Sequence, residues 1–120
     1  MDSILDSVKS YLGIMSDDKA FDTDILMSIN AVMFALNQLG AGPSEPVVVE
    51  DATQEWIDYF DESAIGIVRQ YVNMRSKLLF DPPSNNQIMD ALKEQIAEAE
   101  WRILAYFDQK NYATQEVRSE

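Results

Sequence analysis

An apolar helical segment ends abruptly at Pro82 and Pro83, and a second helical pattern begins directly after them. Proline lacks a backbone N–H and fixes its own φ angle, and it also disfavours the helical conformation of the residue before it. The run Phe80-Asp81-Pro82-Pro83 therefore predicts a fixed corner between two helices. In the simpler interpretation Asp81 caps the N–H groups that follow, and the run only sets the turn. In the alternative, the corner also presents a surface to a neighbouring subunit or protein.

The two helices that flank this corner show clear apolar periodicity. Residues 63–79 carry two apolar stripes, which predicts a central helix. The stripes comprise Ile67, Tyr71, Met74 and Leu78 on one side and Ile65, Val68, Val72 and Leu79 on the other. After the corner, Ser84 and Gln87 have the spacing of a capping box that opens a helix running to about Phe107. Its apolar face comprises Ile88, Leu92, Ile96, Ala99, Ile103 and Phe107, with Trp101 and Leu104 at the flanks.

Two amphipathic helices are expected before this pair. Asp2 or Ser3 can cap a short first helix, which Gly13 ends. Asp22 or Thr23 can cap a second helix of about 17 residues, which ends at Gly40. The apolar face of the second helix comprises Ile25, Ile29, Val32, Leu36 and Leu39, and Met27, Met33 and Phe34 widen it.

Residues 41–52 cannot continue a helix and are expected to form an extended loop. The β-prone Val47–Val49 has no second convincing strand to pair with, so either valines pin the loop or the segment joins a neighbour's sheet edge. Asp51 or Thr53 then caps a short helix that carries Trp56, Ile57 and Phe60.

These elements predict an all-α fold, a small bundle of four to five helices with one extended loop at residues 41–52 and a flexible C-terminal tail. The chain has 120 residues, which suits one domain. We expect a helical domain over residues 1–108 and a polar tail over residues 109–120.

The composition leaves little catalytic chemistry. The chain has no cysteine and no histidine, which excludes disulfides, thiolate nucleophiles, imidazole bases and the usual zinc ligands. Asp17, Asp18, Asp22 and Asp24 lack the glycine and closing glutamate of a calcium loop, so they are interpreted as solvated caps. Asp90, Glu94, Glu98 and Glu100 fall on an exposed helical face, which disfavours paired catalytic carboxylates. We predict no enzyme, no catalytic or metal site and no cofactor.

The net charge of −12 is uneven. Residues 1–62 hold 13 acidic and 2 basic residues, whereas residues 63–120 hold 8 acidic and 7 basic residues. The acidic half repels nucleic-acid backbones and anionic membranes. The sequence contains no apolar run of membrane-spanning length and no basic signal-peptide region at its start, so an intracellular product without membrane contact is expected.

The basic residues suggest a surface between subunits. Arg69, Asn73 and Lys77 form a polar strip on the central helix, opposite in charge to the N-terminal half. Arg75 falls inside an apolar stripe, where it needs a carboxylate from its own chain or from another subunit. The candidate subunit interface is therefore Arg69, Arg75, Lys77 and Trp56. Both tryptophans are expected to be core or interface anchors, and Arg102 is expected to pair with Asp81 or another acid at the corner.

Several motifs together resemble the tailed-bacteriophage head–tail connector family. They are Tyr11-Leu12-Gly13-Ile14, Phe21-Asp22-Thr23-Asp24-Ile25, Leu39-Gly40-Ala41-Gly42, Leu78-Leu79-Phe80-Asp81-Pro82-Pro83 and Glu100-Trp101-Arg102-Ile103. The resemblance spans about residues 8–105. Its most specific elements are the turn Phe80, Asp81, Pro82, Pro83 and the helical motif Glu100, Trp101, Arg102.

The resemblance implies an all-α head-completion adaptor that forms a ring of about twelve copies on the portal after DNA packaging and joins head to tail. Its implied partners are itself, the portal protein and a downstream head-completion or tail protein. Genomic DNA would pass through the ring without specific binding. The implied location is the head–tail interface of the virion, after a period in the host cytoplasm. The charge also permits an acidic DNA mimic that binds a basic nucleic-acid-binding protein of host or phage.

Overall fold

The computed structural model describes residues 3–118, with side chains described for residues 3–108. Residues 3–118 form four α-helices and one short 3-10 helix. They are α1 Ile4–Leu12, α2 Asp22–Gln38, η1 Trp56–Asp58, α3 Glu62–Phe80 and α4 Asn86–Arg118. This part of the chain forms no strand, and an isolated antiparallel bridge joins Ser3 to Glu55. The predicted all-α fold with one extended loop is confirmed.

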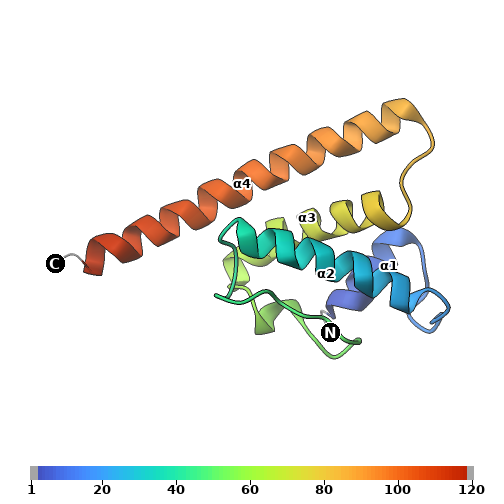
Figure 1. Cartoon of the computed structure of the whole chain (residues 1–120), viewed down its shortest axis with the longest axis horizontal. Coiled ribbons are helices and arrows are strands. Elements are labelled where there is room, and N and C mark those ends of the chain that lie inside the picture. The colour runs from blue at the N-terminus through green and yellow to red at the C-terminus, as the bar shows by residue number, and fades with distance from the viewer. Residues whose placement is uncertain (1–2, 119–120) are drawn as a thin grey trace.

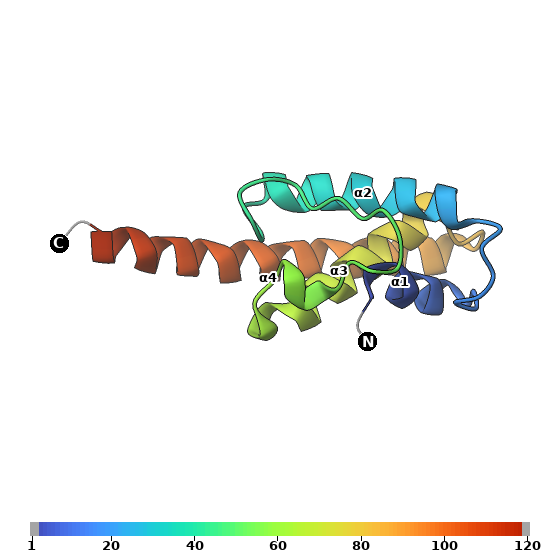
Figure 2. The same ribbon diagram turned by 90° about the horizontal axis from the view of Figure 1, so that it is seen from below.

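α3 is the central helix and packs against α1, α2, η1 and α4. α2 crosses in front of α3 in Figure 1, and Figure 2 shows α1 on the other side of α3. α4 runs antiparallel to α3: the Ser63 and Tyr106 hydroxyls lie 2.6 Å apart, and Tyr71 reaches Glu100 further along. The last turns of α4 extend beyond the bundle (Figure 1). The predicted end of this helix near Phe107 is wrong, because α4 continues to Arg118. The predicted flexibility of the tail falls on residues 109–120, whose side chains lie outside those described.

The core follows the predicted periodicity with a few exceptions. α4 buries Leu92, Ile96, Ala99, Ile103 and Phe107, and α3 buries Val68, Tyr71, Val72 and Met74. The expected coverage of Met27 and Phe34 is wrong, because 68% and 54% of these residues is exposed. They lie on the side of α2 opposite to Ile25, Ile29 and Val32. Leu79 and Ile88, near the corner, are also exposed.

The ends of α1 are formed as the sequence predicts. The Asp6 N–H donates to the Ser3 hydroxyl at 3.2 Å, so Ser3 is the N-cap. Gly13 ends the helix with φ 81°, a left-handed conformation in which its N–H bonds back to the carbonyls of Lys9 and Ser10.

Three other predicted caps are wrong. Phe21 occupies the N-cap position of α2 and makes no side-chain capping bond. At α4, Asn85 replaces Ser84: its Oδ1 accepts the N–H groups of Gln87 at 2.8 Å and Ile88 at 3.2 Å. At η1, the side chains of Glu55 and Asp58 form the capping box. At α4 and η1 several polar residues adjoin the helix start, and the turn geometry decides which of them reaches the free N–H groups.

The extended loop is fixed to α2 by a side-chain amide. Asn30 donates from Nδ2 to the Val49 carbonyl at 3.0 Å and accepts the Val49 N–H at Oδ1 at 2.8 Å. Val47 and Val49 are buried whereas Val48 is exposed, the alternation of an extended chain. Asn30 therefore replaces the missing neighbour strand, and the interpretation of a loop pinned by valines is confirmed.

Gly42 shapes the beginning of the same loop. Its φ of 84° lies in the left-handed region, and a Cβ at this position would stand 2.7 Å from the Phe60 ring. Any side chain here would therefore strain the backbone and displace an aromatic ring of the core.

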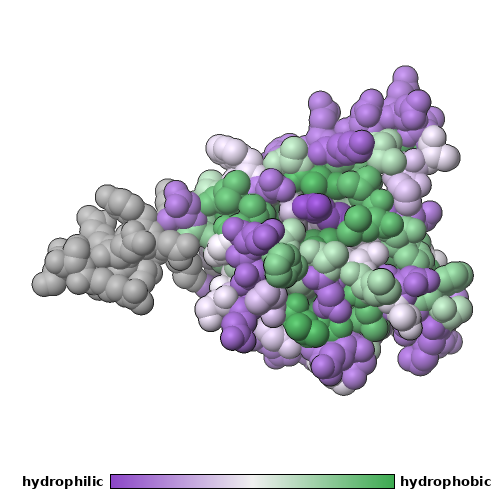
Figure 3. All heavy atoms as spheres, in the orientation of Figure 1, coloured by the Kyte–Doolittle hydropathy of each residue, from purple (hydrophilic) through white to green (hydrophobic). Residues whose placement is uncertain are grey.

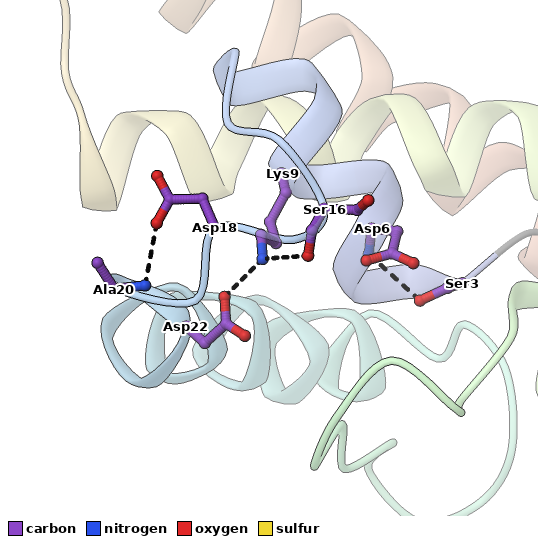
Figure 4. Close-up of polar contacts among 7 residues, drawn as sticks. All are labelled: Ser3, Asp6, Lys9, Ser16, Asp18, Ala20 and Asp22. Carbon is purple, nitrogen blue, oxygen red and sulfur yellow. Dashed lines mark hydrogen bonds and ion pairs between the residues drawn. The ribbon is translucent and has the colours of Figure 1, made fainter.

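One buried cation joins α1, the following loop and α2 (Figure 4). The Lys9 ammonium donates to the Ser16 carbonyl at 3.1 Å and forms an ion pair with Asp22 Oδ1 at 2.7 Å. Only 1% of the Lys9 side chain is exposed, so its charge depends on these partners. Sequence reasoning assigned Asp22 to a cap and Lys9 to no role.

We expect Asp22→Ala to destabilise the fold by about 3 kcal/mol, because it leaves a buried ammonium without its counter-charge. Asp24→Ala is the matched control, since it removes a second acid from the same first turn but from an exposed position. That control should cost less than about 0.5 kcal/mol. Urea unfolding followed by circular dichroism measures both, and equal losses would show that the helix dipole, and not the ion pair, is responsible.

Candidate functional site

The corner between α3 and α4 is fixed by local contacts and presents an exposed surface. The Asp81 N–H bonds to the Lys77 carbonyl at 2.8 Å, and the Asp81 carboxylate lies 3.6 Å from the Lys77 ammonium. Asp81 thus closes the last turn of α3, and the prediction that it caps α4 is wrong. The expected pair between Arg102 and an acid at the corner is also wrong, because Arg102 pairs with Glu98 of its own helix at 2.6 Å. Asp81 and Pro82 are exposed, which leaves them accessible to a partner.

Motifs far apart in the sequence meet beside this corner. The Phe80 ring packs edge to face against Phe21, with ring centroids 6.0 Å apart. Phe21 directly precedes Asp22, which is held by Lys9 of α1. The corner is therefore positioned by α1 and α2 as well as by its own prolines.

A polar joint connects α3 to α4 halfway along their contact. Arg75 Nη1 donates to the Tyr71 hydroxyl at 2.9 Å, and that hydroxyl donates to Glu100 Oε2 at 3.2 Å. The Arg75 guanidinium also lies 5.7 Å from the Tyr71 ring centroid. The sequence predicted that Arg75 needs a carboxylate partner. That carboxylate is Glu100 of the same chain, and the Tyr71 hydroxyl connects the two side chains. Burial raises the pKa of Tyr71, and Arg75 opposes that shift.

Arg69 and Trp56, two candidate interface residues, lie together. The Arg69 guanidinium lies 6.0 Å from the centre of the Trp56 ring. Trp56 is fully buried, so the structure places it in the core behind Arg69. Arg69 and Asn73 line an open cleft of about 440 Å³ with the polar side of α1. Lys77, the third member of the strip, is directed toward the corner through its ion pair with Asp81.

Trp101 of the helical motif is an exposed tryptophan, with 68% of its surface accessible. It lines a groove of about 380 Å³ between α4 and the end of α2. The other lining residues are Leu39, Leu104, Ala105 and Asp108. A large exposed indole beside an apolar groove is typical of an interface anchor.

The outer face of α2 is a surface that sequence reasoning missed. We define it by Met27, Ala31, Phe34 and Gln38, all of which are exposed. Hydrophobic side chains gather over the face of the molecule that carries α2 (Figure 3). The signal in the sequence is that residues 25–44 contain no charged residue.

The described side chains supply contact surfaces and no metal site. Among residues 3–108, no cluster of three or more acidic, histidine or cysteine side chains could hold a metal ion. None of the helices in the described part of the chain combines the length and hydropathy needed to cross a bilayer.

The Tyr71 joint predicts a pH effect on stability. The raised pKa of Tyr71 means that the folded state favours the neutral phenol. The stability gained in this way is fully present below pH 10.0, the ordinary pKa of tyrosine, and is lost as the pH rises through the pKa of Tyr71 in the folded state. Tyr71→Phe should cost about 1 kcal/mol at neutral pH, because it removes the shared hydroxyl. The difference in unfolding free energy between wild type and variant should shrink above pH 10, as measured by urea unfolding at several pH values. A difference that stays constant to pH 11 would contradict the assignment.

The comparison with protein families agrees with this arrangement of helices and surfaces. A family described as phage connector protein matches residues 4–110, which include all the motifs discussed above. No curated protein and no solved structure matches the chain. The match covers most of the 120 residues, and the chain belongs to the phage connector protein family.

Proposed function

We propose that this protein is a head–tail connector that assembles as a ring on the portal after DNA packaging and joins the head to the tail. The observation that carries the proposal is the family match over residues 4–110. The structure supports it with a compact helical body that bears an exposed corner, an exposed tryptophan and an uncharged helix face. These are features of a protein that works by contact.

A ring built by head-to-tail contacts needs two different complementary patches on each subunit. Its partners would be about twelve copies of itself, as the resemblance implies, with the portal above and a head-completion or tail protein below. Exposed Asp81 and Pro82 at the corner and Trp101 on α4 are candidates for these contacts. Three of the predicted interface residues make contacts within their own chain: Arg69, Arg75 and Lys77. In the proposed ring they would position the helices beside an interface as well as contact a partner.

The acidic N-terminal half suits a ring through which DNA passes. Residues 1–62 hold 13 acids against 2 bases, and such a surface repels phosphates. If these acids line the bore, the genome moves through without sticking. A map of the assembled ring with the acids on its outer rim would remove the basis for this part of the proposal.

The proposal is tested by light scattering coupled to size-exclusion chromatography, with the chain alone and with its portal protein. We expect large oligomers to form, and we expect the portal to promote them. A monomer or dimer at every concentration, with no response to the portal, would contradict the proposal. That result would favour the acidic DNA mimic, whose binding to a basic nucleic-acid-binding protein the same column can detect.

Replacing both corner prolines tests whether the corner takes part in assembly. We expect Pro82→Ala with Pro83→Ala to keep the helical circular dichroism signal but to lose ring formation, because the angle between α3 and α4 is released. Ile88→Ala is a suitable control, since it alters an exposed residue just after the corner and leaves the prolines intact. Loss of folding in the double variant would instead show that the corner acts only within the subunit.

A further inference from the structure

The charge pattern of the chain singles out one surface on which copies of it can meet. The protein carries a net charge of −12, and no charged residue lies within residues 25–44. Two copies that approach through acidic faces repel each other, whereas an uncharged face avoids that repulsion. The outer face of α2 also exposes Met27 and Phe34, two large apolar side chains without cover.

The end of α4 is a segment suited to this face. The helix runs to Arg118 and leaves the bundle, so its last turns point away from the α2 of the same copy (Figures 1 and 2). Residues 109–118 contain Lys110, Glu116 and Arg118, a net charge of +1, unlike the acidic N-terminal half. Ten helical residues span about 15 Å, close to the distance that separates Met27 from Gln38 along α2.

We propose that the outer face of α2 binds the projecting end of α4 from a second copy of this chain. The two surfaces differ, so the contact is heterologous and can be repeated from subunit to subunit, as a closed ring requires. Asp24, the exposed acid in the first turn of α2, adds attraction for the basic residues of the incoming helix. This inference rests on the proposed connector function and assigns the contact that closes its ring.

Cysteine cross-linking tests the contact directly, because the native chain contains no cysteine. Phe34→Cys is combined, one variant at a time, with cysteine at positions 112, 113, 114 and 115, which together cover all sides of a helix. The matched control places the first cysteine at Met15, an exposed residue outside α2. Each variant is oxidised under conditions where light scattering shows oligomers, with the portal protein added if the chain alone is monomeric.

We expect at least one member of the Phe34 series to give a ladder of disulfide-linked oligomers that includes more than about half of the chains. The Met15 series should link less than about one tenth, since a disulfide forms only where two Cβ atoms come within about 4.5 Å. Circular dichroism of each variant establishes that it is folded.

Equal ladders in the two series would overturn the inference, because they would reflect random collision. Oligomers that form without any ladder in the Phe34 series would overturn it while the proposed function stands. A chain that stays monomeric even with the portal protein would overturn both.

Discussion

The ion pair between Lys9 and Asp22 fixes α1 against α2. Its ammonium is buried and holds three segments at once: α1, the Ser16 carbonyl in the following loop and the first turn of α2. With Asp22 fixed, the neighbouring Phe21 is placed against Phe80 at the end of α3. A single basic side chain in a strongly acidic region thus sets the position of the corner that the prolines make rigid.

The rest of the bundle depends on α3, whose two sides are covered in different ways. Toward α2 the contact is apolar, because the residues that α2 buries are all apolar, among them Ile29 and Val32. Toward α4 it includes the joint of Arg75, Tyr71 and Glu100, which satisfies a half-buried guanidinium inside the subunit. Apolar contacts tolerate sliding more readily than hydrogen bonds do, so the joint defines the register of α3 against α4.

The sequence was sufficient for the helices and for most of their buried faces, because a period of 3.6 residues is repeated many times in each. It was insufficient where one residue had to be chosen among neighbours. Asn85 rather than Ser84 caps α4. Asp22 forms an ion pair with Lys9 and does not cap its own helix. The exposure of Met27, Phe34 and Trp101 could not be read from hydrophobicity, since an apolar residue looks the same whether it faces its own core or a partner. The family motifs located the corner correctly. The absence of charge in residues 25–44 became informative only when the structure showed that the outer face of α2 is exposed.

Most packed helices in this bundle are neighbours in the sequence: α1 with α2, α2 with α3, and α3 with α4. Chains with such low contact order reach the native state quickly, within about microseconds to milliseconds for small helical bundles. The chain can therefore complete its own fold long before it encounters another protein. In the assembly proposed above, this chain would therefore join as a finished part, and encounter between partners would set the rate.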